Sequence, residues 1–393
     1  MTTQGLTVLG GISAEQFFAE YWQKKPLLVR NALPQVVGLL VPQDIMDLAQ
    51  EEVVTARLLT QQGAQNEQWR VKNSPFTGKD FKKLPPLWTL LVQALDHFSP
   101  EVAQLWQQFD FIPQWRRDDI MVSYAPKGGS VGRHYDQYDV FLVQGFGSRR
   151  WQLGQYCSPD CELIANQPLR LLPEIDIWFD EVLQPGDLLY VPPTLAHYGV
   201  AQDDCLTFSF GFRMPSAAQL LEEFTDELLN GADAIQIPVP DVAARPLQSA
   251  GLVAAQDLNL LKQHLMQMMQ DPLAFEQAAL RLLSESKYPD SLPENESLTL
   301  DELKQLLQSG ATIMREPAVK LLYQQDDSGQ VTFWALGEPL ELNESIKPLL
   351  KALADGATLD QSSIALTEDN LATLCQLHAD AVILIIPSDD DND

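Results

Sequence analysis

Apolar and polar residues change their spacing along the chain, and each change marks a new region. Up to about residue 110 the spacing is mostly helical. Residues 13–25, SAEQFFAEYWQKK, predict a helix, because Ser13 and Gln16 match a capping box and Pro26 follows the segment. The stretches DIMDLAQEE and PPLWTLLVQALDHF predict two more helices. The chain is therefore expected to begin with a helical region.

Residues 119–213 follow a different pattern, that of short strands separated by Gly and Pro turns. The runs are DIMVSYAP, YDVFLVQG, RRWQLG, GDLLYVPP and CLTFSFGFR, all rich in β-branched and aromatic residues. Short strands at this spacing predict an antiparallel sandwich or barrel of the jelly-roll kind. With the helices before it, this β core is expected to form one domain over residues 1–215, in a chain of the α+β class.

Helical spacing returns from about Ala217 to Lys287. One apolar stripe of this region consists of Leu258, Leu261, Leu265, Met268 and Met269. The stripe is typical either of a satellite helical bundle or of a dimerisation element, and the pattern does not choose between them. We treat residues 216–290 as this helical region.

The last part of the chain begins after a polar, proline-bearing stretch, YPDSLPENES, which we interpret as a linker. A predicted helix, TLDELKQLLQSG, precedes a hairpin that turns at Asp327, Ser328 and Gly329, and two further helices end near Ile386. This order over residues 291–387 is similar to a winged helix. The final residues, 388–393, are expected to be a disordered acidic tail.

Composition narrows the possible partners. The 393 residues are too many for one ordinary domain, and the formal net charge is −28. Such a charge repels phosphate backbones, and from Pro293 to the end 5 Lys/Arg face 19 Asp/Glu, so no direct nucleic-acid binding is expected. The charge would attract basic proteins, although it could equally serve solubility alone.

The location of the protein is predicted from what the sequence lacks. No apolar run reaches the roughly 18 residues of a membrane span, and the first residues do not resemble a secretory signal. The four cysteines suggest neither a disulfide framework nor a zinc site. A cytoplasmic protein without membrane association is therefore expected.

The candidate chemistry lies in the β region, which holds two of the five histidines. On a strand, His134 and Asp136 would share one face and Asp139 would point to the other. His197, which follows the strand GDLLYVPP, could supply a third ligand. Two histidines and one carboxylate form the facial triad of non-haem Fe(II) oxygenases, which leaves coordination positions open. A hydrogen-bonded structural pair is the alternative for the H-x-D motif by itself.

An Fe(II) oxygenase that uses 2-oxoglutarate and dioxygen also needs a buried cation for the distal carboxylate of the cosubstrate. Arg149 and Arg150 are candidates, and because they are adjacent only one can point inward. Thr207, Ser209 and Gly211 share one face of the last strand. The two hydroxyls there could contact the cosubstrate, or the small residues could simply allow loose packing between sheets.

Three stretches, GRHYDQYDVFLVQGFGSRRWQLG, LQPGDLLYVPPTLAHYGVA and SFGFR, together with the opening YWQKKPLLVR, resemble the JmjC-type, cupin-like bacterial ribosomal oxygenases. The resemblance spans nearly the whole chain. It implies a double-stranded β-helix catalytic domain, a helical dimerisation region and a C-terminal winged-helix-like domain. It also implies a homodimer.

The resemblance assigns roles by position. It implies that His134, Asp136 and His197 bind the iron, that Arg149 binds the distal carboxylate of 2-oxoglutarate, and that Ser123 helps to hold the same molecule.

The activity that the resemblance implies is Fe(II)- and 2-oxoglutarate-dependent hydroxylation of an arginine side chain in the basic large-subunit ribosomal protein L-sixteen. Two alternatives remain: a JmjC demethylase of methylated lysine or arginine, and a non-catalytic cupin-like binding protein. Demethylases of this fold commonly use lysine for the distal carboxylate, so the arginine favours hydroxylation.

Overall fold

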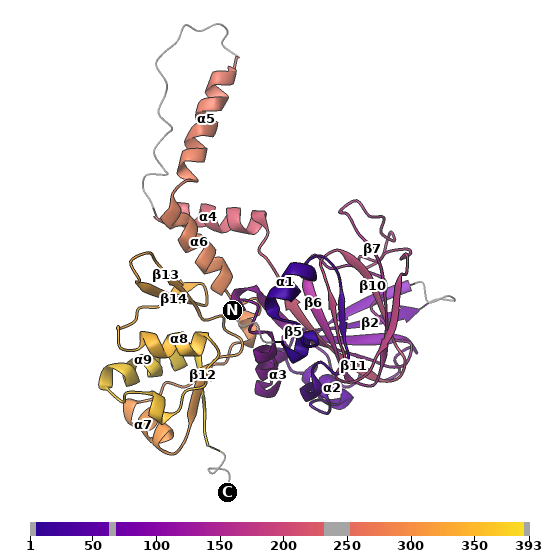
Figure 1. Ribbon diagram of the computed structural model, residues 1–393, viewed down its shortest axis with the longest axis horizontal. Coiled ribbons are helices and arrows are strands. Elements are labelled where there is room, and N and C mark those ends of the chain that lie inside the picture. The colour runs from indigo at the N-terminus through magenta and orange to yellow at the C-terminus, as the bar shows by residue number, and fades with distance from the viewer. Residues whose placement is uncertain (1–4, 63–67, 232–251, 389–393) are drawn as a thin grey trace. The chain divides into compact units, whose positions relative to one another are not determined.

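The computed structural model describes residues 5–62, 68–231 and 252–388 (Figure 1). The chain divides into two compact units. The first unit runs to Met214 and also contains Lys287–Glu294; the second contains Pro215–Ser286 and the chain from Asn295 onward. The acidic tail predicted over residues 388–393 lies, apart from Ser388, outside the described residues.

Two antiparallel sheets build the first unit. The larger has the order β1-β9-β6-β11-β5-β4-β2-β3 and the smaller the order β10-β7-β8. The larger sheet contains β1 (Leu27–Val29), β2 (Ala56–Gln62), β3 (Gln68–Asn73), β4 (Trp88–Val92), β5 (Arg117–Ala125), β6 (Asp139–Phe146), β9 (Leu188–Val191) and β11 (Cys205–Phe212). The smaller contains β7 (Arg149–Tyr156), β8 (Phe179–Leu183) and β10 (Leu195–Ala201). The α+β, jelly-roll prediction is confirmed.

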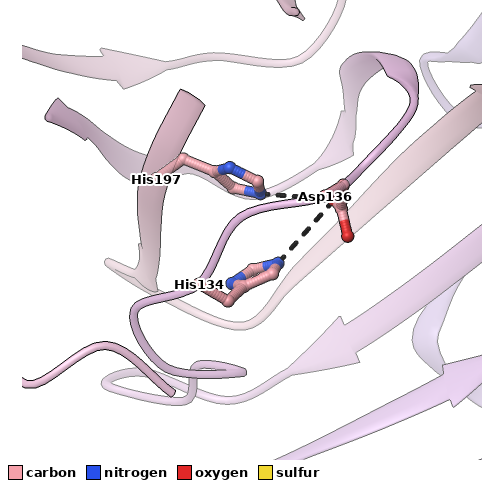
Figure 2. Close-up of side chains that lie close together, drawn as sticks. All are labelled: His134, Asp136 and His197. Atoms are coloured by element: carbon pink, nitrogen blue, oxygen red, sulfur yellow. Dashed lines mark ion pairs between the residues drawn. The ribbon is translucent and has the colours of Figure 1, made fainter. Parts of the chain in front are cut away.

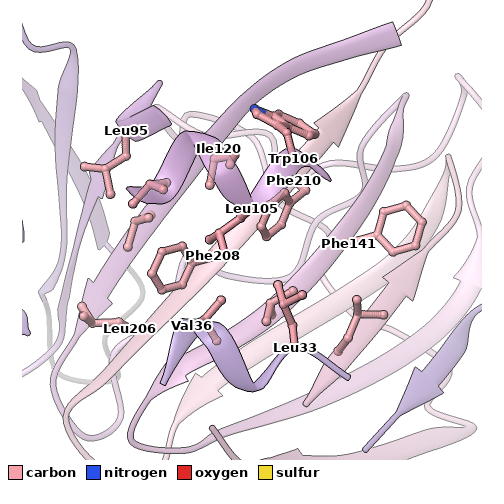
Figure 3. Packing of buried hydrophobic residues seen from close by; sticks show 14 of the residues in the cluster. Leu33, Val36, Leu95, Leu105, Trp106, Ile120, Phe141, Leu206, Phe208 and Phe210 are labelled. Carbon is pink, nitrogen blue, oxygen red and sulfur yellow. The ribbon is translucent and has the colours of Figure 1, made fainter. Parts of the chain in front are cut away.

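The main hydrophobic core lies on the outer face of the larger sheet, under the helical segments of the first unit. These segments are α1 (Ala14–Glu20), α2 (Pro42–Leu48), α3 (Pro100–Gln104) and the 3-10 turns η1 (Thr7–Leu9), η2 (Pro34–Val36), η3 (Leu95–His97), η4 (Leu105–Phe109) and η5 (Gln114–Arg116). Phe208 and Phe210 of β11 point into this core, where Phe210 packs edge-on against Trp106 with ring centroids 5.4 Å apart (Figure 3). The apolar side of β11 therefore anchors the sheet, and its small residues face the other way.

The helix predicted at PPLWTLLVQALDHF is wrong. Residues Trp88–Val92 form β4, which pairs with both β2 and β5, and only Leu95–His97 make a single 3-10 turn. Leu90 and Val92 are fully buried on one face and Leu91 nearly so on the other. A strand buried on both faces reads as a continuous apolar run, which spacing cannot distinguish from a buried helix. Strands β2 and β3 were also not predicted, because the region up to about residue 110 was interpreted as mostly helical.

Helices of the second unit begin with α4 (Ala217–Gly231), α5 (Ala255–Met268) and α6 (Pro272–Ser284). Arg281 of α6 lies 3.4 Å from Glu223 and 3.6 Å from Glu227 of α4, which ties these two helices together. None of the residues of α5 is buried.

The C-terminal part contains the predicted helix, hairpin and helices: α7 (Leu300–Gln308), β13 (Leu322–Gln325), β14 (Val331–Ala335), α8 (Lys347–Ala354) and α9 (Glu368–Ala379). The short β15 (Glu338–Pro339) pairs with β14. The chain then adds β16 (Ile383–Ile386), which pairs with β12 (Thr312–Arg315), so the last element among the described residues is a strand instead of a helix. No helix in the described parts of the chain is both long and apolar enough to cross a membrane.

The stretch interpreted as a linker is structured at its start. Pro289–Ser291 form a 3-10 turn, η7, and this segment packs within the first unit.

Candidate metal and cosubstrate site

Three side chains converge between the two sheets (Figure 2). Nε2 of His197 lies 3.6 Å and Nε2 of His134 lies 4.0 Å from Oδ2 of Asp136. One potential ligand atom from each residue falls within 4.8 Å of the others, a spacing that could hold one metal ion. His197 belongs to β10, whereas His134 and Asp136 lie in the loop between β5 and β6.

The expectation that His134 and Asp136 share a strand face is wrong, because they precede β6 and only His134 makes a bridge, to His197. Other contacts fix the loop: the amide of Thr194 donates to the carbonyl of Asp136 over 2.6 Å. Asp139, the first residue of β6, does point away from the site, since its carboxylate accepts a hydrogen bond from Tyr190 in the main core.

Both imidazoles are oriented by main-chain carbonyls. Nδ1 of His134 lies 3.1 Å from the oxygen of Gly132, and Nδ1 of His197 lies 2.9 Å from that of Leu195. A carbonyl only accepts, so each Nδ1 carries the proton and each Nε2 presents a lone pair toward Asp136. Burial, followed by the neighbouring His134, lowers the pKa of His197 to about 4, which keeps it neutral. The set is therefore ready to bind a metal.

The cluster opens into a cavity of about 310 Å³ between the sheets. Met121, Ser123, Thr207 and Ser209 line it from the larger sheet, and Arg149 and Trp151 line it from the smaller. Four buried polar atoms of its wall have no hydrogen-bond partner in the described structure: Nε of Arg149, Nε1 of Trp151, Nε2 of Gln93 and the hydroxyl of Tyr135. Buried donors normally find partners, so the cavity is suited to an oxygen-rich ligand.

Arg149 and Arg150 have opposite surroundings. Arg149 is 1% exposed, and its only hydrogen bond within the described residues is a long contact of 3.5 Å to Sγ of Cys205. Arg150 points outward and pairs with Asp180, with Nε 2.6 Å from Oδ1. A buried guanidinium without a carboxylate is costly, and an anionic ligand in the cavity offsets that cost. The residues therefore fit a metal with a dicarboxylate cosubstrate beside it.

The predicted hydroxyl residues lie on the wall of this cavity. Ser123 of β5 and Thr207 of β11 are paired across the two strands, with Oγ of Ser123 3.5 Å from the carbonyl of Thr207. The Thr207 hydroxyl donates to Oε1 of Gln144 over 3.1 Å, and Ser209 is 8% exposed. The cavity thus brings Ser123, Arg149, Thr207 and Ser209 together with the three candidate metal ligands, whereas Asp139 and Arg150 point away from it.

Sequence reasoning missed Asp119. It lines the cavity, is 5% exposed, and lies four residues before Ser123 on the same face of β5. Extending the two-residue alternation back from Ser123 through Met121 would have found it. Burial, and then the nearby Asp118, raise the pKa of Asp119 to about 6.

A jelly roll with two histidines, one aspartate and a buried arginine around one cavity is the arrangement of a 2-oxoglutarate-dependent non-haem Fe(II) oxygenase. Residues 104–220 match the JmjC domain family, and residues 267–382 match the ROXA-like winged helix.

Two relatives that match this chain over most of their length support the same family. A Haemophilus influenzae protein named "Probable ribosomal oxygenase" is 45% identical over 89% of this chain and 87% of its own. The Escherichia coli ribosomal protein uL16 3-hydroxylase is 32% identical over 90% of each chain. The chain therefore belongs to the family of JmjC-type ribosomal oxygenases, and it is a 2-oxoglutarate-dependent dioxygenase.

Solved structures of a ribosomal oxygenase share the fold of this chain. The crystal structure of E. coli ycfD superimposes with a TM-score of 0.82 at 29% identity, covering 95% of this chain and 98% of that one. A structure of the same protein with cobalt and 2-oxoglutarate gives 0.79 over the same shares. The predicted resemblance, fold and cofactor class are confirmed.

Proposed function

We propose that this enzyme hydroxylates an arginine side chain of large-subunit ribosomal protein uL16 (L-sixteen), using Fe(II), 2-oxoglutarate and dioxygen. The observation that carries the chemistry is the metal-binding triad beside a buried arginine that lacks a carboxylate partner in the described structure. The substrate is supported by the similarity to the E. coli uL16 3-hydroxylase over 90% of each chain.

In this proposal His134, Asp136 and His197 hold the iron. Arg149 receives the distal carboxylate of 2-oxoglutarate, because a guanidinium binds a carboxylate through two parallel N–H bonds. Ser123, Thr207 and Ser209 add hydroxyls along the same wall. When bound, iron and cosubstrate supply the oxidising power that inserts one oxygen atom into an unactivated C–H bond, with succinate and carbon dioxide as coproducts.

The protein itself supplies the cavity and the side chains that position the target. Asp119 offers a buried carboxylate on the cavity wall and is, in this proposal, the group that receives the cationic end of the target side chain. The net charge of −28 would steer a basic ribosomal protein toward the enzyme. The same charge opposes direct binding of nucleic acid.

The helical region, residues 216–290, is proposed to form a homodimer, with the winged-helix-like domain following it and the catalytic domain, residues 1–215, preceding it. Leu258, Leu261 and Leu265 of α5 are 57%, 51% and 59% exposed. Large aliphatic side chains repeated on one helix face are suited to a second copy of the same helix. A substrate on the ribosome would place the enzyme in the cytoplasm.

Mass spectrometry tests the proposal. Ribosomal proteins from a strain that lacks this enzyme are incubated with it, Fe(II) and 2-oxoglutarate, and a His134→Ala variant serves as the control. We expect a gain of one oxygen atom on uL16 alone, which fragmentation places on arginine. Loss of a methylene mass would instead identify a demethylase, and an unchanged mass with intact cosubstrate turnover would overturn the assigned substrate.

A further inference from the structure

Residues Lys287–Glu294 follow α6 in the chain, yet they belong to the same compact unit as the catalytic sheets. Lys287 Nζ lies 2.8 Å from Oδ2 of Asp118, and the hydroxyl of Tyr288 lies 3.1 Å from Oδ2 of Asp119. Oγ of Ser291 lies 2.7 Å from Nδ1 of His97. This segment therefore packs behind the start of β5, where it contacts two adjacent carboxylates.

The two carboxylates differ in their partners. Asp118 pairs with both Lys287 and Arg213. Asp119 has no cation within 4.0 Å in the described part of the chain, although it lines the cavity and Asp118 does not. Asp118 is thus paired with two cations, whereas the carboxylate of Asp119 is left for a cationic ligand to pair with.

The hydrogen bonds of Asp119 come from one side. The amide of Ala94 donates to Oδ2 over 3.0 Å, and the Tyr288 hydroxyl is bonded to the same oxygen. Two donors on one oxygen fix the plane of the carboxylate and leave Oδ1 for the cavity. Tyr288 is not part of the cavity wall, so it acts on Asp119 from behind.

The same hydroxyl reaches a second cavity residue. It lies 3.3 Å from Oε1 of Gln93, which lines the cavity next to Asp119. Nε2 of Gln93 is buried and has no hydrogen-bond partner in the described structure. A hydroxyl has one proton to donate, and the charged carboxylate of Asp119 is a stronger acceptor than Oε1 of Gln93, so we assign the Tyr288 hydrogen bond to Asp119.

We infer that Tyr288 is a positioning residue for the substrate. Its hydroxyl donates to Oδ2 of Asp119 and holds the carboxylate so that Oδ1 accepts the N–H groups of the target guanidinium. This inference rests on the proposed function. The segment Lys287–Glu294 would then help the enzyme to select a cationic side chain.

The test compares Tyr288→Phe with Ser291→Ala, using a synthetic peptide that spans the target arginine of uL16. Each substitution removes one hydroxyl from the same segment, but only the first removes a contact with Asp119. We expect Tyr288→Phe to raise the KM for the peptide by about tenfold, the size of one lost hydrogen bond to a charged group. The kcat and the KM for 2-oxoglutarate should stay within about twofold, and Ser291→Ala should change none of these values.

A second readout does not depend on how much of a variant is folded. In each enzyme kcat/KM is compared for the arginine peptide and for the same peptide with citrulline, its neutral analogue. We expect the wild-type preference for arginine to fall by about tenfold in Tyr288→Phe, because Asp119 is no longer held in place. An unchanged ratio in Tyr288→Phe would overturn the inference, as would an equal fall in Ser291→Ala.

The variant Asp119→Asn separates this inference from the proposed function. It should abolish the preference for arginine over citrulline, and adding Tyr288→Phe to it should have no further effect on that ratio. If Asp119→Asn leaves the ratio unchanged, the assigned substrate seat is wrong. If Asp119→Asn lowers it while Tyr288→Phe does not, the seat stands and the positioning role is wrong.

Discussion

The main-chain amide of His197 donates to the carbonyl of His134 over 2.8 Å, and the amide of His134 donates back to the carbonyl of His197 over 3.1 Å. This reciprocal pair joins β10 to the loop before β6 and brings the two imidazole centroids within 4.2 Å. The backbone therefore fixes the relative position of both histidines, and the metal does not have to assemble them.

The metal ligands give the first prediction. Replacing His134 or His197 with alanine removes one of three ligands, and we expect turnover of 2-oxoglutarate to fall at least hundredfold. Titration with Fe(II) under anaerobic conditions, followed by calorimetry, should show the lost affinity. His264→Ala on α5 is the matched control and should retain both properties. Full turnover in His134→Ala would contradict the assignment of the site.

The second prediction concerns the two arginines. Arg149→Met should raise the KM for 2-oxoglutarate by about hundredfold, since bidentate bonds to a carboxylate are lost. Without cosubstrate the same variant should melt at a higher temperature, because a buried charge without a carboxylate partner has been removed. Arg150→Met, which loses only an exposed pair with Asp180, should change neither value appreciably. Equal effects of the two substitutions would argue against the role given to Arg149.

A pH dependence follows from Asp119. Burial and then Asp118 raise the pKa of Asp119 to about 6. The carboxyl is therefore charged at pH 7.5 and becomes neutral as the pH falls below about 6. A neutral carboxyl attracts a guanidinium weakly. The KM for the uL16 peptide should therefore rise below about pH 6 in the wild type, with no such rise in Asp119→Asn. A steady-state profile at saturating 2-oxoglutarate measures this, and identical profiles would refute the role of Asp119.

The fourth prediction concerns the exposed face of α5. Leu261→Glu together with Leu265→Glu places charges where apolar contact with a second copy is proposed, so the double variant should be monomeric. Gln263→Glu on the same helix should leave the dimer intact. Sedimentation velocity distinguishes the two states, and a wild-type protein that is already monomeric would contradict the proposed interface.

Local pattern predicted the parts of the site that depend on strand alternation. The alternation of β11 predicts that Thr207 and Ser209 share the face opposite Phe208 and Phe210, and in the structure that face lines the cavity while the phenylalanines lie in the main core. The same alternation could not choose between Arg149 and Arg150, since the choice depends on how β7 lies against β10.

Other features depend on contacts that sequence spacing does not encode. Both faces of β4 are buried, with Leu90 and Val92 on one and Leu91 on the other, and a continuous apolar run of that kind also fits a helix. Tyr288 reaches Asp119 across 169 positions, from a stretch whose polar, proline-rich composition indicates a linker. His134 and Asp136 converge through a loop and a single bridge instead of through a strand face.

Oxygen labelling tests the central claim most directly. Purified enzyme, Fe(II), 2-oxoglutarate and the uL16 peptide are allowed to react under ¹⁸O₂, and the peptide and succinate are analysed by mass spectrometry. The proposed dioxygenase reaction predicts one labelled oxygen on the target arginine and one in each succinate formed, in equal amounts. Label in succinate without label in the peptide would contradict the assigned substrate, and absence of label from both would contradict the oxygenase chemistry itself.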